Sequence, residues 1–232
     1  MGCDSGSCDS GSCDSGSCET GTCGSNRGLP PGMLEAYKLS IDRSDGFLVW
    51  IELDRSGPSP RVSEGTRRGL QRIREVNDGS RVWGVVFGHI ELKPLYPEIY
   101  GLGVETLYEV HSKDLITYHP EAYASCISQI IIRTEPAAFI SAHSPRSLEI
   151  SARVAAMLET GFLPRTSYFS ADGRRVSFTI RTDNGSSVLE VTTFPQIATV
   201  YPDGLPAAPL LTAKGTVIYW QFDGCGLKEI VG

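Results

Sequence analysis

Short apolar runs alternate with amphipathic segments of helical period from about residue 47 to residue 161, and this alternation limits the fold most. The first run, residues 47–53 (FLVWIEL), combines aromatic and β-branched residues and predicts a buried strand. Further strands are predicted at residues 81–88, 106–110 and 137–142. Helices are predicted at residues 63–76, 120–133 and 147–159, with a loop or short helix over 92–102. This order predicts a parallel sheet covered by helices on both faces.

The pattern changes after Gly161, which we expect to close the last of these helices. Residues 166–170 and 176–180 predict a hairpin joined through Asp172-Gly173, and a second turn at 183–185 leads into residues 187–193. A short strand is predicted at residues 197–200, and residues 216–222 are a candidate for one more. The sequence therefore predicts an α/β protein whose mostly parallel sheet carries an antiparallel hairpin extension.

Five of the seven cysteines recur every fifth residue near the N-terminus, at Cys3, Cys8, Cys13, Cys18 and Cys23. This period fits neither a helix nor a strand, and the repeat is rich in Gly and Ser, so we expect residues 1–32 to form a flexible tail and linker. The five thiols are candidate ligands for a metal ion or an iron–sulfur cluster. The alternative is a low-complexity repeat without a fixed role. A folded domain is then expected at residues 33–204, with a C-terminal extension at 205–232.

His143 follows a predicted strand and precedes a predicted helix, the place where open α/β sheets bind their ligands. With Ser144 and Arg146 it is a candidate cofactor-binding or anion site, and a polar loop is the alternative. No histidine has the spacing to Ser and Asp that would indicate a catalytic triad. Cys126 is expected to be a buried apolar residue. Five arginines near the second predicted element are expected to form a solvated face: Arg61, Arg67, Arg68, Arg72 and Arg74.

Charge and composition exclude several classes of protein. The net charge is −6, which argues against a nucleic-acid partner, because binding to phosphates requires a basic face. No apolar run approaches the ~20 residues of a membrane span. No secretory signal is visible, and we expect a cytoplasmic protein with reduced thiols.

Four segments, in order, resemble the N-terminal domain of electron transfer flavoprotein alpha subunits. The first is the strand at residues 82–88, and the second is Glu135-Pro136 with the strand that follows it. The third, residues 151–158 (SARVAAML), is similar to the family's Ala-Pro-Arg-Val-Ala-Ala run. The fourth, residues 194–202 (FPQIATVYP), is similar to its Pro-x-Ile-x-Thr-Val-Arg-Pro segment. The resemblance implies a Rossmann-like fold of the adenine nucleotide alpha hydrolase type.

The chain departs from this family at two places. The family's Gly-containing loop before the Arg-Val-Ala-Ala helix reads here as residues 142–149 (AHSPRSLE), and the 30 residues after Pro202 contain no second Gly-rich unit that would hold FAD. We therefore expect a truncated alpha-like subunit that lacks the flavin domain. It would be an accessory subunit rather than an independent enzyme.

The resemblance implies pairing with a beta-like subunit and electron transfer to or from a dehydrogenase or reductase. Any FAD would then be held in the complex with the partner rather than by this chain alone. The alternative is a non-redox nucleotide-binding or scaffold module of the same fold type.

Overall fold

The computed structural model describes residues 29–40, 44–88, 92–113, 115–201, 209–223 and 226–230. The cysteine repeat, with the metal-ligand prediction made for it, lies outside these residues, as does His89. Within the described ranges, no helix is long and apolar enough to cross a membrane.

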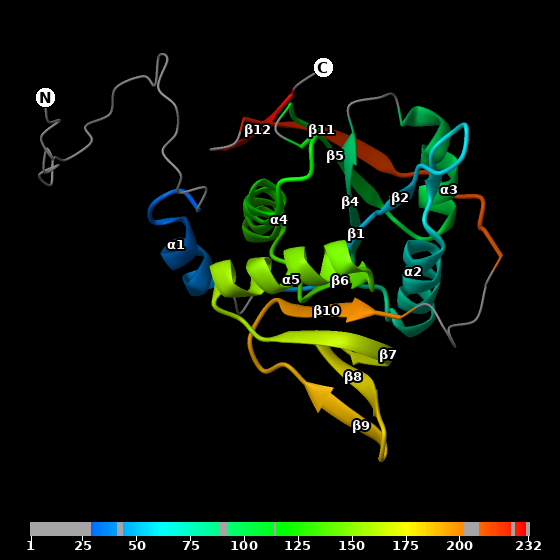
Figure 1. Cartoon of the computed structure of the whole chain (residues 1–232), viewed down its shortest axis with the longest axis vertical. Helices are drawn as coiled ribbons and strands as arrows, with labels where there is room; N and C mark the ends of the chain where they lie inside the picture. Colours follow the sequence, from blue (N-terminus) through cyan, green and yellow to red (C-terminus); the bar gives the residue numbers. More distant parts are fainter. Residues whose placement is uncertain are drawn as a thin grey trace, which may run out of the picture.

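A ten-stranded sheet forms the centre of the described chain (Figure 1). Its strands, in sheet order, are β12 (Leu227–Glu229), β11 (Thr216–Phe222), β5 (Thr106–His111), β4 (Val82–Gly88), β1 (Phe47–Trp50), β6 (Ala138–Ala142), β10 (Gln196–Val200), β7 (Phe162–Asp172), β8 (Arg175–Thr182) and β9 (Gly185–Glu190). The strands from β11 to β7 pair in parallel, whereas β12, β8 and β9 pair antiparallel to their neighbours. The predicted α/β class and hairpin extension are confirmed.

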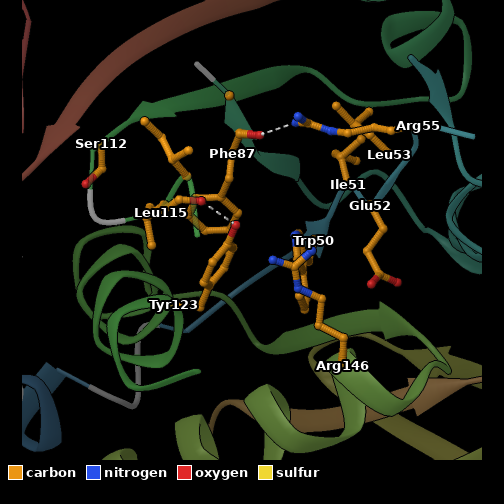
Figure 2. A pocket seen from close by; sticks show the side chains of 12 residues that line it. Trp50, Ile51, Glu52, Leu53, Arg55, Phe87, Ser112, Leu115, Tyr123 and Arg146 are labelled. Carbon is orange, nitrogen blue, oxygen red and sulfur yellow. Dashed lines mark hydrogen bonds between the residues drawn. The ribbon is translucent and has the colours of Figure 1, made fainter. Parts of the chain in front are cut away.

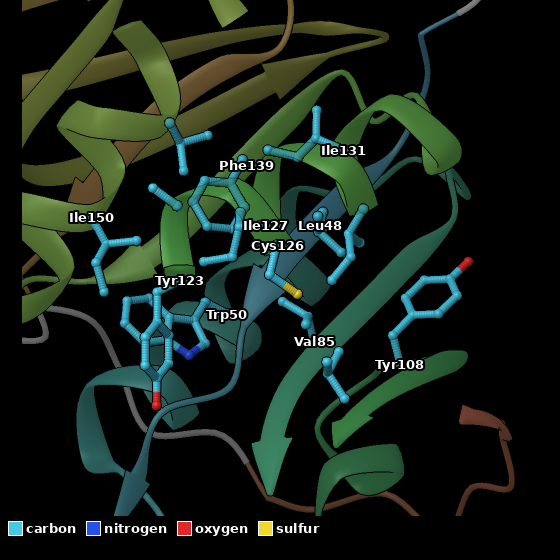
Figure 3. Packing of buried hydrophobic residues seen from close by; sticks show 14 of the residues in the cluster. Leu48, Trp50, Val85, Tyr108, Tyr123, Cys126, Ile127, Ile131, Phe139 and Ile150 are labelled. Carbon is cyan, nitrogen blue, oxygen red and sulfur yellow. The ribbon is translucent and has the colours of Figure 1, made fainter. Parts of the chain in front are cut away.

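Helices cover both faces of this sheet. The described helices are α1 (Met33–Ser40), α2 (Glu64–Val76), the 3-10 turn η2 (Lys93–Leu95), α3 (Tyr96–Gly101), α4 (Pro120–Thr134) and α5 (Pro145–Leu158). One core packs the apolar sides of α4 and α5 on Leu48, Trp50 and Phe139, and Cys126 is buried within it as predicted (Figure 3). The other core packs α2 and α3 on Phe47, Val49 and Ile51. Successive side chains of β1 therefore point into opposite cores, because side chains alternate between the two faces of a strand.

Several boundaries differ from the sequence prediction. β1 ends at Trp50, and the next two residues lead into a small two-stranded sheet of β2 (Leu53–Asp54) and β3 (Arg61–Val62). α5 ends before Glu159, whose φ of 52° supplies the left-handed position that was expected at Gly161. The C-terminal segment contributes β11 beside β5 and also β12.

The prediction of a solvated arginine face is wrong for Arg72. Its guanidinium donates to the carbonyl oxygen of Phe169 at 2.9 Å and lies 3.9 Å from the ring centroid of Tyr168. Arg72 is only 9% exposed, because β7 packs against α2 at this point. A basic residue on a helix thus joins two parts of the chain that are far apart in sequence.

Candidate functional site

A cavity of about 210 Å³ lies at the carboxyl ends of the central strands. The order of the strands in the sheet reverses at β1, because β4 and β5 lie on one side of it and β6 and β10 on the other. We call this place the switch point. Ligands of open α/β sheets bind at this kind of switch point. The lining residues come from β1 and β4 and the segment after β1, from the segment after β5, and from α4 and α5: Trp50, Ile51, Glu52, Leu53, Arg55, Phe87, Gly88, Ser112, Leu115, Ile116, Tyr123 and Arg146 (Figure 2).

Glu52 is the acidic group of this switch-point cavity. Its backbone carbonyl accepts from Ser63 N at 2.8 Å and its backbone N–H donates to Thr66 Oγ1 at 3.2 Å, which fixes it beside the start of α2. Ser144 Oγ donates to its Oε1 at 3.2 Å. Burial raises the pKa of Glu52 to about 7, although the Ser144 hydrogen bond and the charge of Arg146 both lower it. At neutral pH this carboxyl can therefore act as either a hydrogen-bond donor or an acceptor.

Two arginines and an aromatic cluster form the remaining walls. The Arg146 guanidinium lies over the rings of Tyr118 and Tyr123, at 4.5 and 4.7 Å from their centroids. Arg55 donates to the carbonyl oxygen of Phe87 at 3.3 Å. The rings of Trp50, Phe87 and Tyr123 contact one another, with centroids 4.9–6.2 Å apart. Cations held against aromatic faces beside a titratable carboxyl suit a small polar ligand with a planar or anionic group.

At the start of α5, the helix cap and a proline reduce the number of backbone N–H groups that are free to bind a phosphate in this cavity. Ser144 caps the helix by accepting from the backbone N–H of Ser147, and the Ser147 hydroxyl accepts from the backbone N–H of Ser144. Pro145 at the first helical position has no N–H. Two of the amides in the first turn, those of Ser144 and Ser147, are therefore already used within the chain.

The three predicted cofactor-binding residues are divided between two places. Ser144 and Arg146 face Glu52 and the switch-point cavity. His143 lies away from it, with Nδ1 3.0 Å from Thr199 Oγ1 and its ring 4.3 Å from that of Tyr201. Burial and the charge of Arg165 lower the pKa of His143. Consecutive residues of an extended segment point to opposite sides, which explains the division.

Other sequence candidates have structural partners. His111 pairs through Nε2 with Glu109 at 2.8 Å, and Arg153 pairs with Glu121 and Glu149. The described residues hold no group of three or more His, Cys, Asp or Glu side chains that would suit a metal ion.

The sequence analysis did not predict Glu52, Arg55 or the aromatic residues that line the cavity as site residues. A charged residue directly after a buried run was the available signal for Glu52, because the carboxyl ends of parallel strands meet at one edge of the sheet. Reading the apolar run through to Leu53 placed Glu52 inside a strand and hid that signal.

The fold and site define a class: an open, mostly parallel α/β domain with a ligand cavity at its switch point. The family model for the electron transfer flavoprotein domain matches residues 60–223, and the chain belongs to this family. It is 25% identical over 143 residues to the electron transfer flavoprotein subunit alpha of Bacillus subtilis (strain 168). That alignment covers 61% of this chain and 44% of the Bacillus protein, so the chain spans less than half the length of this relative.

Proposed function

We propose that this chain is an electron transfer flavoprotein alpha-like subunit. It pairs with a beta-like partner and supports electron transfer to or from a dehydrogenase or reductase. The observation that carries the proposal is the family match over residues 60–223, which includes β4, β6 and β10 and both sides of the switch point. The similarity to an alpha subunit favours the alpha-like role. A cytoplasmic location is part of the same proposal.

The edge of the hairpin extension supports pairing with another chain. Within the described residues, β9 pairs only with β8, and all six of its residues are exposed. Val188 is 67% exposed and Leu189 41%. An exposed apolar edge strand favours association with another chain, so we expect a partner to cover β9. A permanent interface would bury more than roughly 2,000 Å² in total.

The described residues do not enclose a flavin. A cavity of about 210 Å³ is smaller than the ~300–1,000 Å³ of ordinary ligand pockets, and FAD is a large ligand. The amides of Ser144 and Ser147 at the start of α5 are also occupied by the cap. If FAD serves this protein, the partner supplies most of its site, and we assign no flavin contact to the described residues.

The test is to purify the full chain from its native cells through an affinity tag and to identify the bound proteins by mass spectrometry. A beta-like subunit present at a one-to-one ratio supports the proposal. A stable monomer without such a partner contradicts it.

A second candidate function is nucleotide binding without redox chemistry. The placement of Arg55 and Arg146 beside Trp50 and Tyr123 favours it, because these side chains offer charge for a phosphate and rings for a base. Titration calorimetry with AMP tests this candidate. Binding that Arg146→Gln weakens, and that the matched variant Arg68→Gln, outside the cavity, leaves unchanged, would favour it over the redox role if the purified complex carries no flavin.

A further inference from the structure

A second hollow, separate from the switch-point cavity, lies where β7 and β8 meet the end of β10. Its volume is about 300 Å³, and Arg165, Ser167, Arg181 and Tyr201 line it. Two of these four residues are arginines, whose guanidinium groups stay positively charged at all physiological pH values. We call these four residues the two-arginine hollow.

The strand geometry brings the two arginines together. Thr166 of β7 pairs with Ile180 of β8, and Arg165 and Arg181 each lie one residue beyond this antiparallel pair. Arg165 has a φ of 58°, a left-handed conformation that is uncommon for residues other than glycine. The pairing of β7 with β10 shifts register here, between Ala198 and Val200. Such irregularities bend a strand and redirect a side chain.

Hydrogen bonds hold this irregular segment in place. The backbone N–H of Arg165 donates to Thr199 Oγ1 at 3.1 Å, and the backbone N–H of Tyr201 donates to the carbonyl oxygen of Thr166 at 2.8 Å. Ser167 Oγ donates to the carbonyl oxygen of Thr179 at 3.2 Å. Both arginine-bearing strands are therefore tied to their neighbours beside the hollow.

The two positive charges lack a counterion in the described part of the chain. Four of the other described arginines have carboxylate partners: Arg67, Arg68, Arg72 and Arg153. Across the same described ranges, neither Arg165 nor Arg181 forms an ion pair. Like charges on neighbouring strands destabilise the pair of strands. A bound anion would relieve this repulsion.

We propose that the two-arginine hollow binds a phosphate dianion, either as free phosphate or as the end of a phosphomonoester. Guanidinium groups match phosphate oxygens with paired hydrogen bonds, and Ser167 and Tyr201 bring hydroxyl groups to the same hollow. The positive charge of the lining comes from the arginines, because His143 does not line the hollow and burial and the charge of Arg165 lower its pKa. This hollow shares no lining residue with the switch-point cavity.

Titration calorimetry of the full chain with inorganic phosphate and with glycerol 3-phosphate tests the proposal. We expect one saturable site for at least one of the two probes, weakened by roughly tenfold or more in Arg165→Gly and in Arg181→Gln. Arg165→Gly removes the side chain and suits the left-handed backbone, so it retains the fold. Arg175→Gln, on the same strand as Arg181 but outside the hollow, is the matched control.

Tight binding of glycerol 3-phosphate identifies an ester as the ligand, and binding of inorganic phosphate alone identifies the free anion. The proposal is wrong if neither probe binds to the unmodified chain. It is equally wrong if Arg165→Gly and Arg181→Gln bind phosphate as tightly as Arg175→Gln does, with thermal melts showing that all three are folded.

Discussion

Ser144 Oγ donates a hydrogen bond to Glu52 Oε1 across 3.2 Å, and this bond joins the end of β6 to the end of β1. The two residues are 92 positions apart in the chain. Ser144 also caps α5, so one hydroxyl both starts a helix and contacts the carboxyl of the switch-point cavity. The stability of α5 and the protonation of Glu52 are therefore linked.

Replacing Ser144 tests this link. Ser144→Ala removes the cap and is expected to lower the free energy of unfolding by about 1 kcal/mol. It should also raise the pKa of Glu52 further, because the lost hydrogen bond favours the charged carboxylate. Ser144→Thr should restore both properties. Urea denaturation and carboxyl NMR titration measure them, and an unchanged Glu52 pKa in Ser144→Ala would contradict the link.

Glu52 should make stability depend on pH. Its pKa in the folded chain is about 7, above the ordinary value, so the folded state binds more protons than the unfolded state between the two values. Stability therefore falls as pH rises from about 4.5 through 7, by up to about 3 kcal/mol. Glu52→Gln should remove this slope and be the more stable form at pH 8. Parallel slopes for the two proteins in urea melts from pH 5 to pH 8 would show that Glu52 does not titrate as described.

Gln196 should be important for attaching the hairpin extension. Its side chain accepts from Val176 N at 2.9 Å and donates to the carbonyl oxygens of Ala137 and Arg174 at 3.3 and 2.8 Å. Gln196→Ala removes the partners of the Val176 N–H and the Arg174 carbonyl, whereas the Ala137 carbonyl keeps its bond from the backbone N–H of residue 196, and the change should cost about 3 kcal/mol. The exposed Gln221→Ala should change stability by less than about 0.5 kcal/mol. Equal denaturation midpoints for the two variants would refute this role.

The cysteine repeat has two interpretations, a metal site and a low-complexity segment, and a metal site there should bind weakly and through several combinations of thiols. Residues 1–28 contain Cys3, Cys8, Cys13, Cys18 and Cys23, and thiolates suit zinc or an iron–sulfur cluster. Anaerobically purified full chain should carry metal that a variant lacking residues 1–28 does not. Cys126→Ala, which changes a buried thiol, should leave the metal content unchanged. The same trace metal and no sulfide in the full and shortened chains would leave the low-complexity interpretation standing.

The central strands β4 and β6 were predictable because each is an almost continuous apolar run between turn residues. The helix α1 was not predicted, since its eight residues are too few to show a clear period. The left-handed position at Glu159 was also missed, because the sequence offers a glycine two residues later.

The candidate site was predicted in part. The strand-end rule selected Ser144 and Arg146, which lie at the switch point. It also selected His143, which turns to Thr199 and Tyr201 instead. Glu52 depends on where β1 ends, and the apolar pattern does not mark that boundary. Its raised pKa depends on burial by α2 and α5, which only the folded chain provides.

The visible absorption spectrum of the purified native complex, compared with that of the chain alone, tests the central claim most directly. The account predicts a flavin band in a one-to-one complex with a beta-like subunit and no stoichiometric flavin on the chain alone. A complex without flavin that carries AMP or ATP instead would contradict the electron-transfer role. Stoichiometric flavin on the isolated chain would contradict the assignment of the flavin site to the partner.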